Sequence, residues 1–159
     1  MSEECEGKMP PVAPEHQELQ AAVGKWDVDC TFHNMPEPMK CGATDTVESL
    51  GPYWIVATFE CEFPGMPMPF KGLCQMGFDM GAGEYCLSWI DMFSPQMTLL
   101  RGKRGDDGVL RMSGDGLKPE TGEPCAVRSE EQPHDDGTKS FKMWFGDELA
   151  FEYLYRRSS

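Results

Sequence analysis

Apolar and polar residues alternate with a period of two over most of the chain. In the first such run, Trp26, Val28, Cys30 and Phe32 are separated by polar or charged residues. This period puts alternate side chains on one face of an extended strand, so the run predicts a half-buried strand over residues 26–33. Similar runs predict nine further strands, over residues 41–50, 53–63, 70–78, 84–92, 97–104, 108–113, 124–131, 138–145 and 148–157.

Short turn sequences separate these runs. Gly51-Pro52 follows the second run, and Asp-Gly pairs at 107–108 and 136–137 are typical of tight hairpins. A longer loop is predicted over residues 114–124. Many short strands without intervening helices predict an all-β fold, either an antiparallel barrel or a sandwich.

One helix is predicted, over residues 14–23 (PEHQELQAAV). Pro14 suits the first turn of a helix, and Gly24 predicts its end. Residues 1–13 are rich in Pro and Glu and predict a disordered arm. The length of 159 residues suits a single domain, which we expect over residues 14–159.

The two ends of the predicted sheet suggest that it closes on itself. In a closed barrel the first and last strands are neighbours, because closure removes the sheet edges. Gly24 would let the chain turn tightly from the helix into the first strand, and the Trp26 ring would close the barrel floor. Arg156 or Arg157, from the last strand, would lie across that ring. This arrangement resembles the floor of a calycin, a lipocalin-like up-and-down β-barrel.

Composition narrows the range of partners. Hydrophobic residues make up 40% of the chain, the formal net charge is −13 and the pI is near 4.5. This charge argues against nucleic acid or an anionic membrane as a partner. No apolar run approaches the roughly 20 residues that span a bilayer, and the acidic, proline-rich N-terminus does not resemble a secretory signal.

The cysteines indicate a reducing environment. There are seven of them, an odd and scattered number with no CxxC pair. Zinc sites use close ligand pairs, and secreted disulfide scaffolds use even numbers in shorter chains. Cys30, Cys61 and Cys74 lie in strand-like runs, where a free thiol acts as a small apolar side chain. We therefore expect free thiols in a cytoplasmic protein.

Several motifs resemble a bacterial family known as domain of unknown function 1579. They are PEHQELQAAVGKWDV, FECEFPGMPMPFKGLCQMGFD, EYCLSWIDMFSPQM, TGEP and EYLYRR, which occur in this order between residues 14 and 157. Phe78 stands where the family pattern has tyrosine, and Glu123 where it has lysine. The resemblance implies a calycin-like β-barrel and implies no function, because the family has none assigned.

Asp91 is the first candidate for chemistry. It follows Tyr85, Leu87 and Trp89 in the same strand phase. If this face lines the barrel, the carboxyl group would lie in an apolar cavity, where its pKa would rise and it could anchor a ligand or act as an acid or base. Alternatively, Asp91 ends the strand at the rim and accepts hydrogen bonds from the next loop, as is typical of Asp near a turn.

We expect the barrel to bind a small apolar or amphipathic ligand in its interior. Two alternatives remain: a barrel filled by its own side chains that acts as an interaction module, and a small enzyme that uses Asp91 with Glu60 or Glu48. Trp54 and Val56, on the expected outer face of the third strand, suggest a homodimer contact. Strand phase gives the expected ligand-binding residues as Phe59, Met76, Trp89, Asp91, Phe141, Met143 and Tyr153.

No metal or other cofactor is expected. Cys30, His33, Met35 and Met39 are close in sequence and are soft enough for Cu(I). Methionine, however, also serves as flexible apolar filler. Motifs for a serine nucleophile, a Walker loop, a dinucleotide site or a calcium loop are missing from the sequence.

Overall fold

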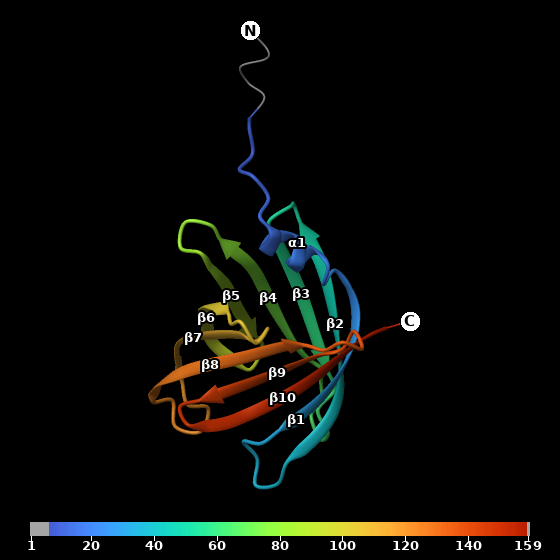
Figure 1. Cartoon of the computed structure of the whole chain (residues 1–159). Helices are drawn as coiled ribbons and strands as arrows, with labels where there is room; N and C mark the ends of the chain where they lie inside the picture. Colours follow the sequence, from blue (N-terminus) through green and yellow to red (C-terminus); the bar gives the residue numbers. More distant parts are fainter. Residues whose placement is uncertain (1–6, 159) are drawn as a thin grey trace.

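The structure is a computed structural model that describes residues 7–158 (Figure 1). Residues 1–6 of the predicted arm lie outside the described residues, and residues 7–13 form neither helix nor strand. No helix in the described part of the chain has the length and apolar character needed to cross a membrane. The elements, in chain order, are α1 (Pro14–Gln20), β1 (Gly24–Phe32), β2 (Met39–Leu50), β3 (Trp54–Cys61), β4 (Phe70–Asp79), β5 (Glu84–Asp91), β6 (Ser94–Arg104), β7 (Leu110–Leu117), β8 (Pro124–Pro133), β9 (Lys139–Phe145) and β10 (Glu148–Arg157).

The ten strands form one closed antiparallel barrel, which confirms the predicted fold class. Each strand pairs with the next along the chain, and β1 closes the barrel by pairing with β10. In that last pair Trp26 is opposite Arg157 and Val28 is opposite Tyr155. The predicted strands match the observed ones closely, because alternation reports which face of each strand is buried.

The predicted helix is too long. It ends at Gln20 rather than at Val23, and β1 already begins at Gly24. Residues 21–23 leave the helix and turn into the barrel, because their carbonyl groups accept hydrogen bonds from side chains of β1 and β10. The indole Nε1 of Trp26 donates to Ala22 O at 2.9 Å, and Arg157 donates to the carbonyls of Ala21 and Val23. Tertiary contacts therefore end this helix, although its propensity would allow another turn.

The predicted end of β7 is also wrong, since the strand continues to Leu117 and the loop is confined to residues 118–123. The pattern suggested a turn because glycine often marks one. Here the glycines permit close packing instead. A Cβ on Gly114 would lie 2.1 Å from Leu99 O, and a Cβ on Gly116 would lie 2.5 Å from Val127 Cγ2. Likewise, β6 begins at Ser94, three residues before the predicted start of this strand at residue 97.

The barrel has two different ends. At the helix end, α1 lies beside β3 and β4, as Figure 1 shows. At the opposite end, called here the loop end, lie the connections 33–38, 62–69, 92–93, 118–123 and 146–147. The buried residues form two clusters, one that includes Leu19 of the helix and one that contains Phe59 and Phe70.

Candidate functional site

The floor at the helix end is built around Trp26. This side chain is only 5% exposed, and the Arg157 guanidinium carbon lies 4.2 Å from the centre of its ring. Gly24 is required here for two reasons: its φ of 138° disfavours other residues, and a Cβ would lie 2.6 Å from Arg157 Nη1. Arg156 points outward instead and pairs with Asp29. The two arginines of the last strand therefore have different roles.

The helix is fixed to this floor by polar contacts. His16 is 2% exposed; its Nδ1 accepts a hydrogen bond from Ala13 N at 2.9 Å, and its Nε2 lies 3.1 Å from Phe78 O. Glu18 accepts hydrogen bonds from Tyr85 and Arg104. Burial and this carboxylate raise the pKa of Tyr85. These groups hold the helix in place, and both nitrogens of His16 are occupied by the fold itself.

Four of the predicted interior residues form one connected aromatic group. The rings of Phe59 and Tyr153 are stacked with centres 5.3 Å apart, Phe59 and Trp89 meet edge to face at 6.1 Å, and Phe141 stacks on Tyr153 at 6.1 Å. Gly72 makes room for this group, since a Cβ there would lie 2.2 Å from the Trp89 ring. The group lies between the middle of the barrel and the loop end.

Two other predicted residues lie elsewhere in the interior. Met76 and Met143 are buried, with 9% and 8% of their surface exposed, and belong to the cluster that includes Leu19 of α1. Met76 lies in the half of β4 nearer the helix end, and Met143 lies in the half of β9 nearer the loop end. Apart from Asp91, the predicted residues therefore lie inside the barrel, but they do not form a single site.

Asp91 occupies the rim, as in the second of its two interpretations. Its Oδ1 accepts a hydrogen bond from Phe93 N and its Oδ2 accepts one from Trp89 Nε1, both at 2.8 Å. The carboxylate thus caps the turn after β5 and orients the indole. Glu60 and Glu48 are exposed and alternate with buried Phe59 and Val47, so they point away from the interior. The structure does not bring either of them to Asp91 as a second carboxylate.

The interior carboxylate that sequence reasoning missed is Asp45. It lies in β2 between buried Ala43 and Val47, opposite Trp26 on one side and Phe59 on the other. Asp45 is 8% exposed, and its Oδ1 has no hydrogen-bond partner among the described residues. Burial raises the pKa of this carboxyl group to about 6. The signal was present in the sequence, since Asp45 shares the inward phase of Ala43 and Val47.

Lys139 is the cation whose charge acts on the Asp45 carboxylate. Its Nζ lies 4.8 Å from the ring centre of Trp26 and 4.9 Å from that of Tyr155, so aromatic faces surround the ammonium group. Its positive charge partly offsets the effect of burial on the pKa of Asp45. Burial and the charge of Asp45 raise the pKa of the Cys74 thiol to about 12. Asp45, Cys74, Lys139 and Tyr155 thus form a small polar group inside an apolar barrel.

The residues considered for a soft metal are separated by the fold. Cys30 lies inside the barrel, opposite Cys41 in the neighbouring strand, and Cys41 Sγ is 3.0 Å from Cys61 Sγ. His33 faces Glu152 instead, with Nε2 2.7 Å from Oε2, and Met35 is 46% exposed. Within residues 7–158, no group of three or more His, Cys, Asp or Glu side chains has the arrangement of a metal site.

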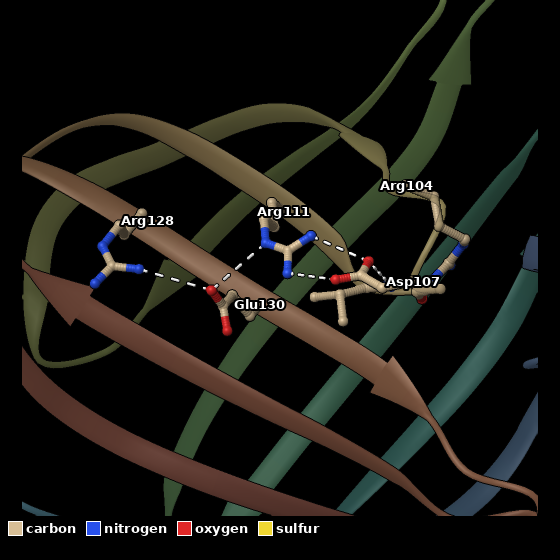
Figure 2. Close-up of polar contacts among 7 residues, drawn as sticks. Arg104, Asp107, Arg111, Arg128 and Glu130 are labelled. Atoms are coloured by element: carbon tan, nitrogen blue, oxygen red, sulfur yellow. Dashed lines mark hydrogen bonds and ion pairs between the residues drawn. The ribbon is translucent and has the colours of Figure 1, made fainter.

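The outer wall carries exposed charges. Arg111 binds Asp107 with Nη2 2.7 Å from Oδ2, and its Nε lies 3.7 Å from Glu130 Oε1, which is also 3.8 Å from Arg128 Nη1 (Figure 2). The Arg111 guanidinium holds the pKa of Asp107 at about 2. Because these side chains are half exposed, solvent screens their attraction. This row links the outer faces of β7 and β8 and offers no enclosed site.

Trp54, expected at a dimer contact, is 43% exposed on the outer face of β3. Its ring packs over Gly77 of β4, where a Cβ would lie 2.5 Å from the indole. Val56, in the same strand phase, is half-buried. A surface depression of about 240 Å³ lies at the loop end and is lined by residues that include His33, Lys118, Phe145 and Leu149. It is separate from the interior polar group.

Comparisons with known proteins identify the family. The family model described as "Protein of unknown function (DUF1579)" matches residues 12–150. The chain belongs to this family. No curated protein matches the sequence significantly.

Two solved structures resemble the barrel of this DUF1579 protein. The crystal structure of Rv2717c from M. tuberculosis has a TM-score of 0.67 at 16% identity, and the match covers 94% of this chain and 100% of that one. A redesigned β-barrel matches with a TM-score of 0.48 at 12% identity, over 89% of this chain and 95% of its own. At such identities the first likeness shows the fold alone.

Proposed function

We propose that the barrel binds a small amphipathic ligand in its interior, with the polar group of the ligand at Asp45. The observation that carries this proposal is the buried Oδ1 of Asp45, which lacks a partner among residues 7–158. Leaving a buried polar atom unsatisfied costs about 1–3 kcal/mol. A ligand that donates a hydrogen bond to this oxygen would remove the cost, which is a physical reason for an acid at this position.

Residual surface on inward-facing side chains supports the presence of space. Ala57, Leu87, Phe141 and Tyr155 pack against the buried core, yet each is only half-buried. In a closed barrel, the wall separates such side chains from the outer solvent. We place the apolar part of the ligand against these inward-facing side chains.

The chemistry of the site favours some ligands over others. The wall supplies aromatic and aliphatic surface. Two buried side-chain oxygens in the inward strand phase have no partner among the described residues, Asp45 Oδ1 and Ser129 Oγ, and the Asp45 carboxylate is a hydrogen-bond acceptor when ionised. A hydroxyl, an amide N–H or an amine can donate to Asp45, whereas a carboxylate would be repelled by it. The ligand we propose is thus an apolar molecule with one neutral or cationic donor group.

Free thiols suggest where such a protein would work. Six cysteines in the described part of the chain are free, and Cys30 and Cys61 are almost fully buried. Thiols of this kind persist in reducing compartments. This supports the proposal of a cytoplasmic protein.

A matched ligand series tests the proposal. A medium-chain alcohol, the amine and the carboxylic acid of equal length would be titrated at pH 7.5, with binding read by displacement of a fluorescent hydrophobic probe. We expect the alcohol and the amine to bind at least tenfold more tightly than the acid. Asp45→Asn should reduce this discrimination to less than threefold.

Two variants serve as controls. Asp91→Asn should leave the discrimination unchanged, because both oxygens of Asp91 are already bound by its own strand and turn. Ala57→Met should fill interior space and weaken all three ligands. The proposal is wrong if no ligand of the series binds, or if Asp45→Asn binds the series as the wild type does.

A further inference from the structure

The loop end carries an exposed apolar surface that the interior site does not use. Its members, called here the methionine rim, are Met35, Met66, Met68, Met92, Phe93 and Met97, each between 45% and 54% exposed. Five of the seven strongly exposed methionines in residues 7–158 belong to the rim. Isolated exposed apolar residues are common on proteins, but a group at one end indicates an interaction surface.

The rim is held by a layer of aromatic rings beneath it. Phe93 lies 5.0 Å from Phe70 and 6.2 Å from Phe63, and Phe63 lies 5.1 Å from Phe32, measured between ring centres. This layer connects two of the loops, 62–69 and 92–93, to β1 and β4. The methionine side chains above it are flexible and polarizable, a combination typical of surfaces that adapt to a partner.

Charge around the rim indicates the chemistry of that partner. The five connections at the loop end contain Glu37, Glu62, Glu120, Glu123 and Asp147, against a single lysine, Lys118. All of these side chains are exposed, and the whole chain has a formal net charge of −13. Such a surface repels anionic membranes and a second copy of itself, and attracts cationic groups.

We propose that the methionine rim binds a basic amphipathic helix of a partner protein. The apolar face of such a helix would contact the methionines, and its lysine or arginine side chains would lie near the acidic loops. Proteins generally bind an amphipathic helix by contacting its apolar face with a hydrophobic surface, while polar residues around that surface face the polar side of the helix. Binding at the rim does not require the interior ligand site.

A synthetic peptide of about 18 residues, five helical turns, would test this proposal. Two versions of the peptide are compared. The first has a leucine face and a lysine face, and the second has the same leucine face with glutamate in place of every lysine. By fluorescence anisotropy we expect the lysine peptide to bind with a Kd on the order of 10 μM and the glutamate peptide at least tenfold more weakly. The triple variant Met66→Gln, Met68→Gln, Met92→Gln should weaken binding of the lysine peptide at least tenfold.

Control variants separate this surface from others. Met80→Gln changes a methionine that is 48% exposed at the helix end and should leave peptide binding unchanged. Asp45→Asn should also leave it unchanged, which distinguishes this proposal from the interior site. Equal binding of the two peptides, no binding of either, or full binding by the triple variant would overturn it. Rim-dependent self-association, or rim-dependent binding to zwitterionic vesicles in place of the peptide, would overturn it as well.

Discussion

The two ends of the barrel are built from different contacts. At the helix end, Trp26 is covered by Arg157, and Glu18 binds both Tyr85 and Arg104. At the loop end, aromatic rings pack on one another and exposed methionines lie above them. The helix end is closed mainly by directional polar contacts, whereas the loop end is covered mainly by apolar contacts beside the hydrogen bonds of Asp91.

Because of this difference, we expect the helix end to contribute most to the stability of the barrel and the loop end to give a ligand access to its interior. Directional contacts between the helix, β1 and β10 require a fixed geometry, so the helix end is suited to close the barrel. Apolar contacts between rings and thioethers are less directional, so the loop end is suited to admit a ligand or to adapt to a partner. The following three predictions test this division, with the largest expected effect first.

The closed floor should dominate stability. Trp26→Ala removes a buried aromatic side chain and should lower the free energy of unfolding by about 3–5 kcal/mol. Phe93→Ala, at the loop end, changes a ring that is 49% exposed and should cost about 1 kcal/mol or less. Urea unfolding followed by circular dichroism measures both values. Similar losses from the two variants would contradict the division.

Asp45, between the two ends, should make stability depend on pH. Its pKa is about 6 in the folded protein against 3.8 in its ordinary state, so the folded chain holds this proton more tightly. The resulting contribution is fully present below about pH 4 and is lost as the pH rises to about 6. The loss amounts to roughly 3 kcal/mol by linkage.

Asp45→Asn should therefore be more stable than the wild type at pH 7 and lack this part of the pH dependence. Thermal unfolding of both proteins between pH 4 and pH 7 measures the difference, which cancels the contributions of the other carboxylates. Parallel curves for the two proteins would show that Asp45 is solvated in the folded state.

Two glycines allow the smallest test. Gly24 at the helix end and Gly65 at the loop end both have positive φ, but only Gly24 would place a Cβ against another residue, Arg157. We expect Gly65→Ala to cost about 1 kcal/mol and Gly24→Ala about 2 kcal/mol or more. Equal costs in thermal unfolding would mean that the Arg157 contact does not tighten the floor.

Strand alternation was sufficient to predict the all-β fold, because it records burial directly. The residues at the two ends of the sheet and the family resemblance then favoured a barrel over a sandwich. It also predicted an arginine of the last strand over Trp26, and Arg157 lies there. Sequence reasoning failed where a tertiary contact decides the local structure. Gly114 and Gly116 continue β7 instead of ending it, because neighbouring strands approach them closely.

The candidate site was harder to predict than the fold. Asp91 and Asp45 both share a phase with apolar neighbours, so the pattern alone could not distinguish them. What distinguishes them is the set of hydrogen bonds: Phe93 N and Trp89 Nε1 satisfy Asp91, whereas Oδ1 of Asp45 has no partner among the described residues. Such a difference arises from side-chain geometry across several strands, which a linear pattern does not contain.

The pairing of β1 with β10 also determines on which side of the barrel a tag or a fused protein would lie. Ser158 N donates to Lys25 O at 2.9 Å, and Pro10 O accepts a hydrogen bond from Tyr53 at 2.5 Å, so the described chain leaves the barrel on the helix side at both extremities. A tag, a surface linker or a fused protein joined at either position would be anchored behind the floor. If the protein were immobilised on a solid surface through such a linker, the methionine rim would face away from that surface. The immobilised molecules would then share one orientation, with the rim exposed to solution.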